Sequence, residues 1–340
     1  IASSTQQTIA NCMGQVHERF SARASLEGMD FQAINTTVSQ VIEQLGADPT
    51  SVALLNKCVD TDAYLGEHTG NVFYLSMLLG SAVREYVVKE RQRQTTARAL
   101  RYDHVIDLVP LGMGAMFIDL GMTPLRDLQN ADRALTEEEA NLLRQHPLAG
   151  AAALPEGFNS VAKMIVRTHH ENLDGSGYPD AMPADQQHIF TRIIRIADAY
   201  DAATAQHVYK EAKSPARVIW EMTCGPFHRF FDRNLVRVLA RLIQPFWIGT
   251  KLRLSNGQYG VVVKYNRRNP FAPDVVIAFD REGQPLAKSE LVGPVELGNE
   301  RTLRIQSCGD EDLSFIYHVT FMDDAPCPAI RQSLFEAAYP

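Results

Sequence analysis

Hydrophobic residues recur at three- and four-residue steps through most of residues 1–246, which is the spacing of amphipathic helices. The pattern predicts helices over Phe31–Leu45 and Val72–Val87. Thr136 and Glu139 form a capping-box pattern and predict the start of a further helix. Strand-like alternation is scarce in this part of the chain, so we expect a helical body.

The pattern changes after Pro245. Residues 251–254 alternate between polar and apolar, and Ser255-Asn256-Gly257 predicts a hairpin turn. Further strands are predicted at 260–263, 275–279, 303–305 and 315–320. We therefore predict a mainly α protein with a small C-terminal antiparallel β domain. The expected divisions are a helical N-terminal segment at 1–50, a helical domain at 51–246 and a β-rich domain at 247–340.

Length and composition narrow the class of protein. A chain of 340 residues predicts about two domains, and a net charge of −7 argues against binding to a nucleic acid polymer. Five widely spaced cysteines without a Cys-x-x-Cys pair indicate free thiols and a cytoplasmic location. The longest apolar stretch, Leu108–Met122, is too short to cross a membrane. The chain begins with Ile1 rather than Met, which suggests a piece of a longer protein.

Histidines and aspartates in the helical part are candidates for a metal site. Adjacent side chains on a helix diverge by roughly 100°, so His169 and His170 can point at one centre only where a helix ends. The turn-forming run from Asp174 to Pro179 follows directly and provides such an end. An isolated histidine such as His68 or His146 is more often an ordinary core or surface residue.

Residues 169–179 read HHENLDGSGYP and resemble the signature HHExxDGxGYP of the HD-GYP domains, a branch of the HD superfamily of metal-dependent phosphohydrolases. All eight specified positions match. The surroundings of His68 and His146, and the segment Arg195–Ala202, are similar to the same family. Residues 249–262 resemble the β appendage of many such proteins, so the resemblance covers roughly residues 50–295.

The resemblance implies a helical bundle of the HD superfamily that binds divalent iron or manganese and hydrolyses cyclic di-GMP. Imidazole and carboxylate are a ligand mixture that suits these metals, and a paired metal site suits phosphoester hydrolysis. The implied metal ligands are His68, Asp119, His146, His169, His170 and Asp198, with Asp119 as the bridging catalytic carboxylate.

Other roles also follow from the resemblance. Asp201 and Lys210 would contact the nucleotide, and the loop Gly177-Tyr178-Pro179 would meet partners such as diguanylate cyclase domains. Glu171 and Asp174 would either orient the histidines or cap the loop. The N-terminal segment suggests a homodimer, and no membrane partner is expected.

The chain also departs from the family pattern. Where the family reads HDIGK, residues 118–122 read IDLGM, so Ile118 replaces a ligand and Met122 replaces a lysine. Tyr64 takes the place of the Glu of three-metal members. The first metal would keep His68, Asp119 and Asp198, whereas the second would keep Asp119 and the other three histidines. The metal content is therefore expected to be sub-stoichiometric.

Three interpretations stay open. In the first, the domain is degenerate, with weak or absent hydrolysis, and acts as a nucleotide sensor or a docking module. In the second, it is an active metal-dependent cyclic di-GMP phosphodiesterase. In the third, the histidines are remnants in a purely structural domain, which is disfavoured because unpaired buried polar groups cost roughly 1 to 3 kcal/mol each.

Overall fold

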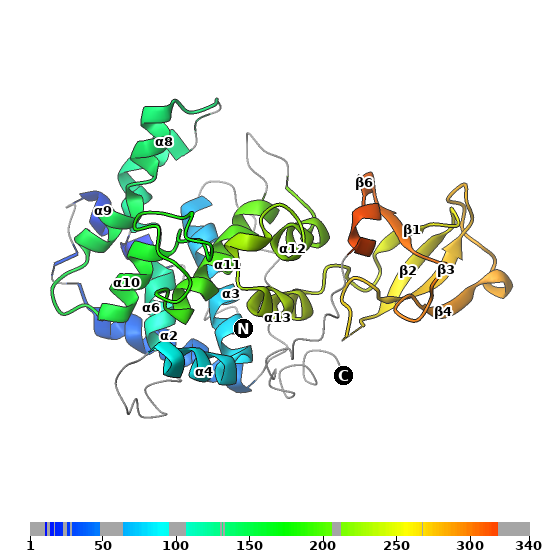
Figure 1. The fold of residues 1–340 in the computed structure, drawn as a ribbon, viewed down its shortest axis with the longest axis horizontal. Coiled ribbons are helices and arrows are strands. Elements are labelled where there is room, and N and C mark those ends of the chain that lie inside the picture. Colours follow the sequence, from blue (N-terminus) through cyan, green and yellow to red (C-terminus); the bar gives the residue numbers. More distant parts are fainter. Residues whose placement is uncertain are drawn as a thin grey trace. The chain divides into compact units, whose positions relative to one another are not determined.

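The computed structural model describes residues 11, 14–16, 18–22, 26–27, 29–47, 64–94, 107–129, 131, 133–205, 212–266 and 268–318. The chain divides into two compact units (Figure 1). Among the described residues, the first is a helical unit formed by those up to 212 together with 229–238, and the second, a β unit, is formed by those in 213–228 and 239–318. No helix in the described ranges combines the length and apolar character needed to span a bilayer.

The helical unit is built from a succession of mostly short helices joined by tight turns. They are α2 (Phe31–Ala47), α3 (Tyr64–Ala82), α4 (Arg84–Gln94), α6 (Val109–Phe117), η2 (Leu120–Leu125), α7 (Arg126–Gln129), α8 (Glu137–Leu143), α9 (His146–Ala153), α10 (Ser160–Thr168), α11 (Ile189–Thr204) and the start of α13 (Arg233–Ile243). The region predicted as one helix over Val72–Val87 is divided between α3 and α4, with a turn at Val83. Thr136 forms the predicted capping box with Glu139 at the start of α8.

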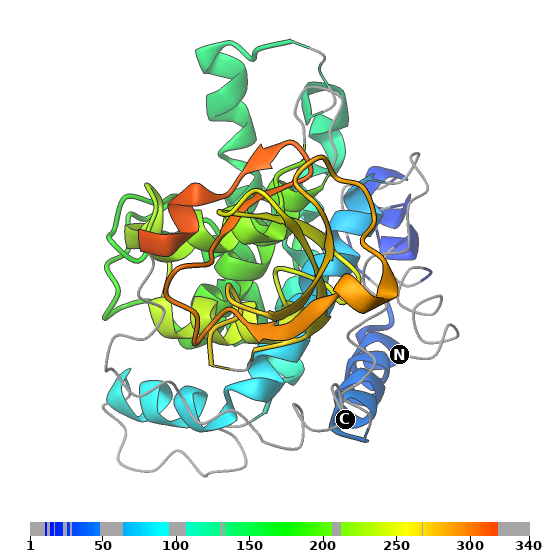
Figure 2. The same ribbon diagram turned by 90° about the vertical axis from the view of Figure 1, so that its right-hand side faces the viewer.

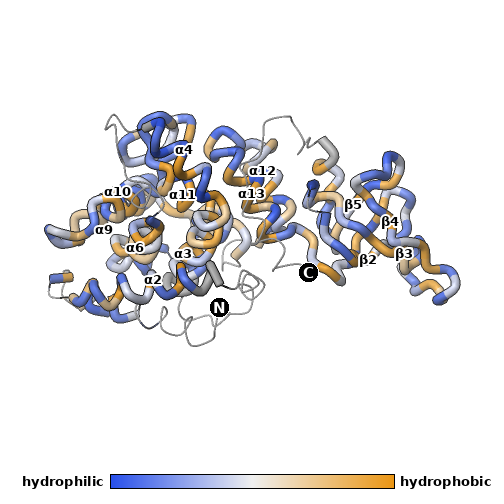
Figure 3. The backbone as a smooth tube through the Cα atoms, turned by 90° about the horizontal axis from the view of Figure 1, so that it is seen from below, coloured by the Kyte–Doolittle hydropathy of each residue, from blue (hydrophilic) through white to orange (hydrophobic). Residues whose placement is uncertain are grey.

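The core of the helical unit lies around α6. This helix is buried along almost its whole length and packs against α2, α3 and α10, while α11 packs against α3. The apolar stretch 108–122 supplies α6 and the first half of η2, so its hydrophobicity reflects burial inside the protein. Figure 3 shows hydrophobic positions on α3, α6 and α11 toward the middle of this unit.

Two glycines allow η2 and α9 to approach each other backbone to backbone. A Cβ at Gly121 would lie 2.1 Å from the carbonyl oxygen of His146, and one at Gly150 would lie 3.2 Å from the nitrogen of Gly121. No larger residue fits at Gly121 without moving main-chain atoms. This close packing places the start of η2, and with it Asp119, beside the first residue of α9.

A buried ion-pair network fixes α11. Arg192 on α11 lies 3.0 Å from Glu90 of α4 and 3.3 Å from Asp232, which precedes α13. The same arginine donates a hydrogen bond to the carbonyl oxygen of Ala184. Because several acceptors share one buried guanidinium, α11 is held against elements far apart in the sequence.

The β unit contains a six-stranded antiparallel sheet in the order β4-β3-β2-β1-β5-β6. Its elements are α12 (Pro215–Thr223), β1 (Lys251–Leu254), β2 (Tyr259–Lys264), β3 (Asp274–Phe279), η4 (Lys288–Glu290), β4 (Val292–Glu296), β5 (Ile305–Cys308), β6 (Glu311–Asp312) and η5 (Ser314–His318), with η3 (His228–Phe230) at the boundary between the units. Register shifts interrupt several strand pairs, and such bulges increase the local twist. In Figure 2 the strands, coloured yellow to red, curve accordingly.

The predicted fold class, mainly helical with a small C-terminal antiparallel β domain, is confirmed. The strand predicted at 315–320 is wrong in its described part, because residues 314–318 form η5 and the Phe315 ring packs against Trp220 of α12. Packing against a helix therefore overrode the β propensity of this segment. Strands β4 and β6 were not predicted, since Gly293-Pro294 breaks the pattern of β4 and β6 is only two residues long.

Candidate metal centre

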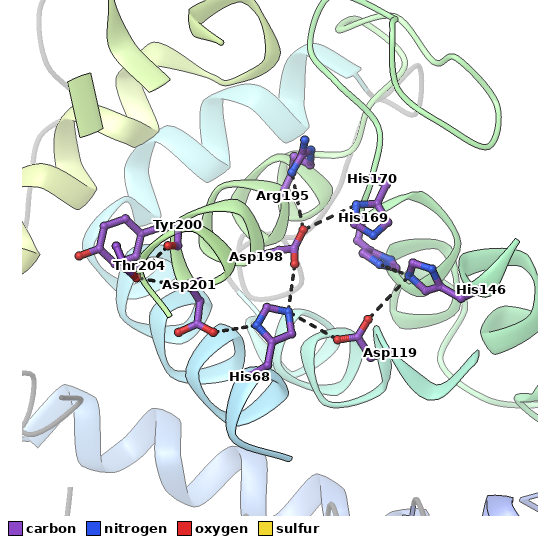
Figure 4. Close-up of polar contacts among 10 residues, drawn as sticks. All are labelled: His68, Asp119, His146, His169, His170, Arg195, Asp198, Tyr200, Asp201 and Thr204. Atoms are coloured by element: carbon purple, nitrogen blue, oxygen red, sulfur yellow. Dashed lines mark hydrogen bonds and ion pairs between the residues drawn. The ribbon is translucent and has the colours of Figure 1, made fainter. Parts of the chain in front are cut away.

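Six histidine and aspartate side chains converge in the helical unit and form what we name the His–Asp cluster (Figure 4). Its members are His68 of α3, Asp119 between α6 and η2, His146 of α9, His169 and His170 after α10, and Asp198 of α11. His68 Nε2 lies 3.1 Å from Asp198 Oδ1 and 3.6 Å from Asp119 Oδ2. Asp119 Oδ1 lies 3.7 Å from His146 Nε2, which is 3.1 Å from His169 Nε2. His170 Nδ1 lies 3.6 Å from Asp198 Oδ2.

The adjacent histidines lie at a helix end, as the sequence predicted. Helix α10 ends at Thr168, His169 is its C-cap, and His170 lies in the following turn. The release of the backbone at this point brings the two rings to a centroid separation of 4.2 Å. Both rings then face His146, which lies 5.1 Å from the His169 ring and 5.0 Å from the His170 ring.

Main-chain carbonyl groups fix the tautomers of two histidines. His146 Nδ1 lies 2.7 Å from the carbonyl oxygen of Leu143, and His169 Nδ1 lies 2.8 Å from that of Val166. A carbonyl oxygen only accepts, so each Nδ1 carries the proton and donates it. Each Nε2 therefore presents its lone pair toward the other when the rings are neutral. Burial and the neighbouring His146 also lower the pKa of His169 to about 4.

Asp119 lies between His68 and His146 in the cluster. Its Oδ2 faces His68 and its Oδ1 faces His146, so one carboxylate spans both. Oδ2 is buried and makes no hydrogen bond within the described part of the chain. A buried carboxylate oxygen without a hydrogen bond is costly unless a cation compensates it.

His68 is held by a second aspartate outside the cluster. Its Nδ1 lies 2.7 Å from Oδ2 of Asp201, which is one helical turn beyond Asp198 on α11. Burial alone would lower the pKa of His68, but hydrogen bonds to Asp198 and Asp201 and the charge of Asp119 raise it well above its ordinary value. Asp201 thus fixes the orientation of the ring and directs Nε2 into the cluster, the arrangement of a carboxylate–histidine–metal triad.

Asp198 is the most heavily compensated carboxylate. Burial would raise its pKa, but the hydrogen bond from His68 and the charges of His170 and Arg195 hold the pKa far below its ordinary value. Arg195 Nη1 lies 3.6 Å from Asp198 Oδ2, three residues away along α11. Asp198 is therefore an anion in the folded protein and a competent metal ligand.

The loop 171–182 packs over His170. The Tyr178 ring stacks on the His170 ring with centroids 4.8 Å apart and an interplanar angle of 24°. A Cβ at Gly177 would lie within 2.5 Å of main-chain atoms of residues 170–172, so this position requires glycine. Glu171 accepts hydrogen bonds from the main-chain N–H groups of Asp180 and Met182 at 2.7 and 2.9 Å.

These contacts resolve the alternative left open for the two acidic residues of the signature. Glu171 holds the loop through main-chain groups, and Asp174 accepts hydrogen bonds from the main-chain N–H and the hydroxyl of Ser176. Both carboxylates cap the loop. The tautomers of His146 and His169 are instead set by main-chain carbonyl groups, that of Leu143 at the end of α8 and that of Val166 in α10.

The cluster fits a metal ion. His146, His169 and His170 each offer a ligand atom, and these atoms all lie within 4.8 Å of one another. Two nitrogens at right angles around one ion, each about 2.1 Å from it, are about 3 Å apart, close to the 3.1 Å between the Nε2 atoms of His146 and His169. The two inward lone pairs, and the Asp119 Oδ2 that accepts no hydrogen bond from a described residue, are what a cation would satisfy. These residues therefore fit an HD-type metal site.

The remaining sequence-based site predictions have different outcomes. Asp201, predicted to contact the nucleotide, is buried against His68, and its nucleotide contact stays a prediction. Lys210 lies outside the described residues, as does the side chain of Tyr64. Ile118 and Met122 are both buried. Sequence reasoning missed Arg195 and Asn172, which donates from its amide to Ser176 and accepts from Arg195.

A sequence signal existed for Arg195 but not for Asn172. Arg195 is three positions before Asp198, so both residues lie on the same side of one helix. Asn172 lies inside the signature at one of its unspecified positions, where the pattern gives no reason to examine it.

Comparison with known proteins agrees with this fold. Residues 83–235 match a family model described as HD domain, and residues 252–312 match one described as KOW domain associated with HD domain. A solved structure, Bd1817, an HDG"Y"P protein from Bdellovibrio bacteriovorus, is similar with a TM-score of 0.51 and 14% identity over 70% of this chain and 72% of that chain. At this identity the likeness concerns the fold alone.

Two curated relatives share more sequence. The cyclic di-GMP phosphodiesterase PA4108 of Pseudomonas aeruginosa is 30% identical over 172 residues, which cover 49% of this chain and 41% of the relative. The cyclic di-GMP phosphodiesterase response regulator RpfG of Xanthomonas campestris pv. campestris is 32% identical over 191 residues, which cover 45% of this chain and 49% of the relative. The chain spans less than half the length of either protein. Residues 83–235 are thus similar to an HD domain, and the chain is similar in sequence to these two cyclic di-GMP phosphodiesterases.

Proposed function

We propose that this HD domain binds cyclic di-GMP at a metal-carrying His–Asp cluster and that its phosphodiesterase activity is weak or lost. The observation that carries the proposal is the distance of 3.1 Å between the Nε2 atoms of His146 and His169. In both rings Nδ1 donates its proton to a main-chain carbonyl group, so neither Nε2 carries a proton when the rings are neutral. The kinship with cyclic di-GMP phosphodiesterases supports the choice of nucleotide.

The ligand roles follow from position in the cluster. One metal ion would have four protein ligands, namely Asp119, His146, His169 and His170. The other would have three, namely His68, Asp119 and Asp198, and would be bound more weakly. A bound divalent iron or manganese ion would act as a Lewis acid toward the phosphate. The protein itself orients the rings through main-chain carbonyl groups and Asp201, and the stacked Tyr178 covers His170.

The expected loss of hydrolysis rests on two side chains. Ile118, directly before Asp119, offers no ligand atom, so a metal on the His68 side would have one imidazole fewer than the family pattern provides. Met122 brings no charge where the family has a lysine. Loss of such a group beside a developing negative charge costs roughly 3 kcal/mol, or about two orders of magnitude in rate. The two losses affect one step and need not add.

A second candidate, an active phosphodiesterase, is favoured by the assembly of all six ligand-type residues into one cluster. With Asp119 in place between His68 and His146, water could complete the coordination on the depleted side. The two candidates share the metal site and the nucleotide and differ only in turnover.

Metal analysis and calorimetry test the proposal. We expect fewer than two equivalents of iron or manganese per chain, binding of cyclic di-GMP by the metal-loaded protein, and little conversion to linear dinucleotide or GMP. Rapid turnover would establish the active candidate instead. Absence of cyclic di-GMP binding by the metal-loaded chain would refute both candidates.

A double variant tests the cause of the loss. Ile118→His with Met122→Lys should raise the metal content and the hydrolysis rate together. The matched control is Ile118→Val with Met122→Leu, which alters the same buried positions but adds neither a ligand nor a charge. Equal results for the two double variants would show that these positions do not limit activity.

The loop 171–182 is the part of the domain that we propose contacts a protein partner. The exposed residues of this loop are Asp174, Ser176, Asp180 and Ala181, and Gly177, Tyr178 and Pro179 among them are half-buried. We assign this exposed edge to docking of a diguanylate cyclase domain. Calorimetry with a purified diguanylate cyclase domain should show binding that Ala181→Arg weakens, and equal binding by the variant would refute the assignment.

A further inference from the structure

We propose that Arg195 binds a phosphate oxygen of the ligand at the His–Asp cluster through the N–H groups of Nη1 and Nη2. This inference deepens the proposed function and rests on it for the identity of the nucleotide. It concerns a residue to which neither the family resemblance nor the metal chemistry gives a role.

Arg195 lies at the edge of the cluster. On α11 it precedes the cluster ligand Asp198 by three residues, and its Nη1 lies 3.6 Å from Asp198 Oδ2. The same Oδ2 lies 3.6 Å from His170 Nδ1. Figure 4 shows the guanidinium beside Asp198, at the end of the cluster where His170 lies. A phosphate on a metal ion held by His170 would therefore have the Arg195 cation next to it.

The guanidinium is held in place by groups that leave its outer donors available. Its Nε donates to Asn172 Oδ1 at 3.1 Å, and its central carbon lies 5.1 Å from the centroid of the Phe231 ring. The main chain of Asn172 is itself anchored, because its main-chain carbonyl oxygen accepts from the side-chain amide of Gln187 at 2.7 Å. These contacts fix the plane of a side chain that would otherwise be long and flexible.

The outer nitrogens of Arg195 make no hydrogen bond to any described residue. The 3.6 Å to Asp198 is an ion-pair distance and exceeds a hydrogen-bond length. Nη1 and Nη2 carry two N–H groups each, and the side chain is 17% exposed, so a ligand can reach them. A largely buried guanidinium whose donors lack acceptors favours an anion, and two parallel N–H groups match two phosphate oxygens.

The position also suits the charge that the ligand brings. Cyclic di-GMP carries two phosphodiester anions, and Met122 provides no cation at the place where the family has lysine. Arg195 supplies a fixed positive charge on the opposite side of the cluster from His68. Because a guanidinium stays protonated, it retains this charge despite its burial.

Calorimetry on the metal-loaded full chain tests the inference. Arg195→Gln should weaken cyclic di-GMP binding about 10- to 100-fold, the range for a lost hydrogen bond to a charged group, and leave the metal content unchanged. Arg195→Lys, which keeps the charge but not the paired donors, should bind with intermediate strength. Arg133→Gln is the control, since Arg133 precedes α8, pairs with Glu139 of that helix and is 54% exposed.

Inorganic phosphate separates this inference from the proposed function. If Arg195→Gln binds both cyclic di-GMP and phosphate as tightly as the wild type, Arg195 does not contact phosphate, even where the wild type binds the nucleotide. If the wild type binds only phosphate and Arg195→Gln loses it, the phosphate contact stands while the proposed nucleotide fails. A wild type that binds neither probe overturns both.

A purely positioning role gives a different result. If Arg195→Gln loses metal together with ligand, Arg195 acts by holding Asp198 and the phosphate contact is overturned. Thermal unfolding checks that each variant is folded. Where Arg195→Gln is unfolded, Arg195→Lys carries the test, and wild-type phosphate affinity in that variant would overturn the inference.

Discussion

The Nε2 atoms of His146 and His169 lie 3.1 Å apart, although each ring already donates its Nδ1 proton to a main-chain carbonyl group. Two facing lone pairs repel each other, so the pair needs a cation, either a proton on one ring or a metal ion bound by both. Burial lowers the pKa of His169, which disfavours a proton on that ring. With His170 and Asp119 adjacent, a metal ion would use all four groups.

Removal of the His169 side chain should abolish the stabilisation of the protein by a metal ion. We expect Mn²⁺ to raise the melting temperature of the wild type, since a ligand at about 100 times its dissociation constant stabilises by about 2.7 kcal/mol. His169→Ala should lose the Mn²⁺-dependent increase. His228→Ala is the control, because His228 also bonds a main-chain carbonyl group, that of Gly225, but lies outside the cluster. A Mn²⁺ shift that persists in His169→Ala would show that the metal binds elsewhere.

Asp201 should affect metal binding without being a ligand. Asp201→Asn keeps the shape of the side chain but weakens its hold on His68 Nδ1, so metal affinity should fall about 10- to 100-fold, as is typical for partners of metal-bound histidines. Isothermal titration calorimetry with Mn²⁺ measures the metal affinity of each variant. Asp274→Asn is the matched control, since Asp274 is similarly buried at 7% exposure against 8% for Asp201 but belongs to the β unit. Equal affinities for the two variants would contradict the positioning role.

The loop 171–182 should not tolerate a side chain at Gly177. A Cβ there would lie 2.3 Å from the nitrogen of Asn172, and main-chain atoms cannot move aside cheaply. Gly177→Ala should destabilise the protein by about 1 to 3 kcal/mol and weaken metal binding by displacing Tyr178 from His170.

The comparison for this variant is Gly70→Ala. Gly70 is in α3, and a Cβ there meets no described atom within 4 Å. That substitution should leave stability unchanged or raise it by up to about 1 kcal/mol, since alanine favours helix. Denaturant unfolding measures both variants, and comparable stability for the two would refute the crowding argument.

His188 should make stability depend on pH. Burial, followed by the charges of Arg91 and Arg192, lowers the pKa of His188 from 6.5 to about 4, and its Nδ1 accepts from the main-chain N–H of Phe190 at the start of α11. Between pH 4 and pH 6.5, His188 therefore binds a proton in the unfolded chain but not in the folded protein. Stability is therefore fully present above pH 6.5 and decreases as the pH falls toward 4, by about 2 kcal/mol at pH 5.

His188→Asn should remove this part of the pH dependence. Asparagine is a good N-cap residue and retains an acceptor for the Phe190 N–H. We expect the difference in unfolding free energy between variant and wild type to change by about 2 kcal/mol from pH 7.5 to pH 5, in favour of the variant. Parallel curves over that range would show that His188 titrates normally in the folded protein.

Much of the cluster could be predicted from sequence because local rules bear on it. The adjacency of His169 and His170, followed by turn residues, required a helix end, and α10 does end there. The resemblance supplied the other ligand types. By contrast, the contact between Asp201 and His68 joins residues 133 positions apart, and local periodicity carries no information about such a pair.

The sequence by itself determined that a helical body precedes a β unit, because side-chain periodicity and turn residues act over a few neighbouring positions. It also determined which residue types could bind a metal. Only the tertiary structure decided that Asp119 lies beside His146, since this depends on the backbone approach of Gly121 to α9. It likewise decided that Arg195 lies against the cluster with outer nitrogens that make no hydrogen bond to a described residue. Both are consequences of packing between distant elements, where shape and burial are set by the whole fold.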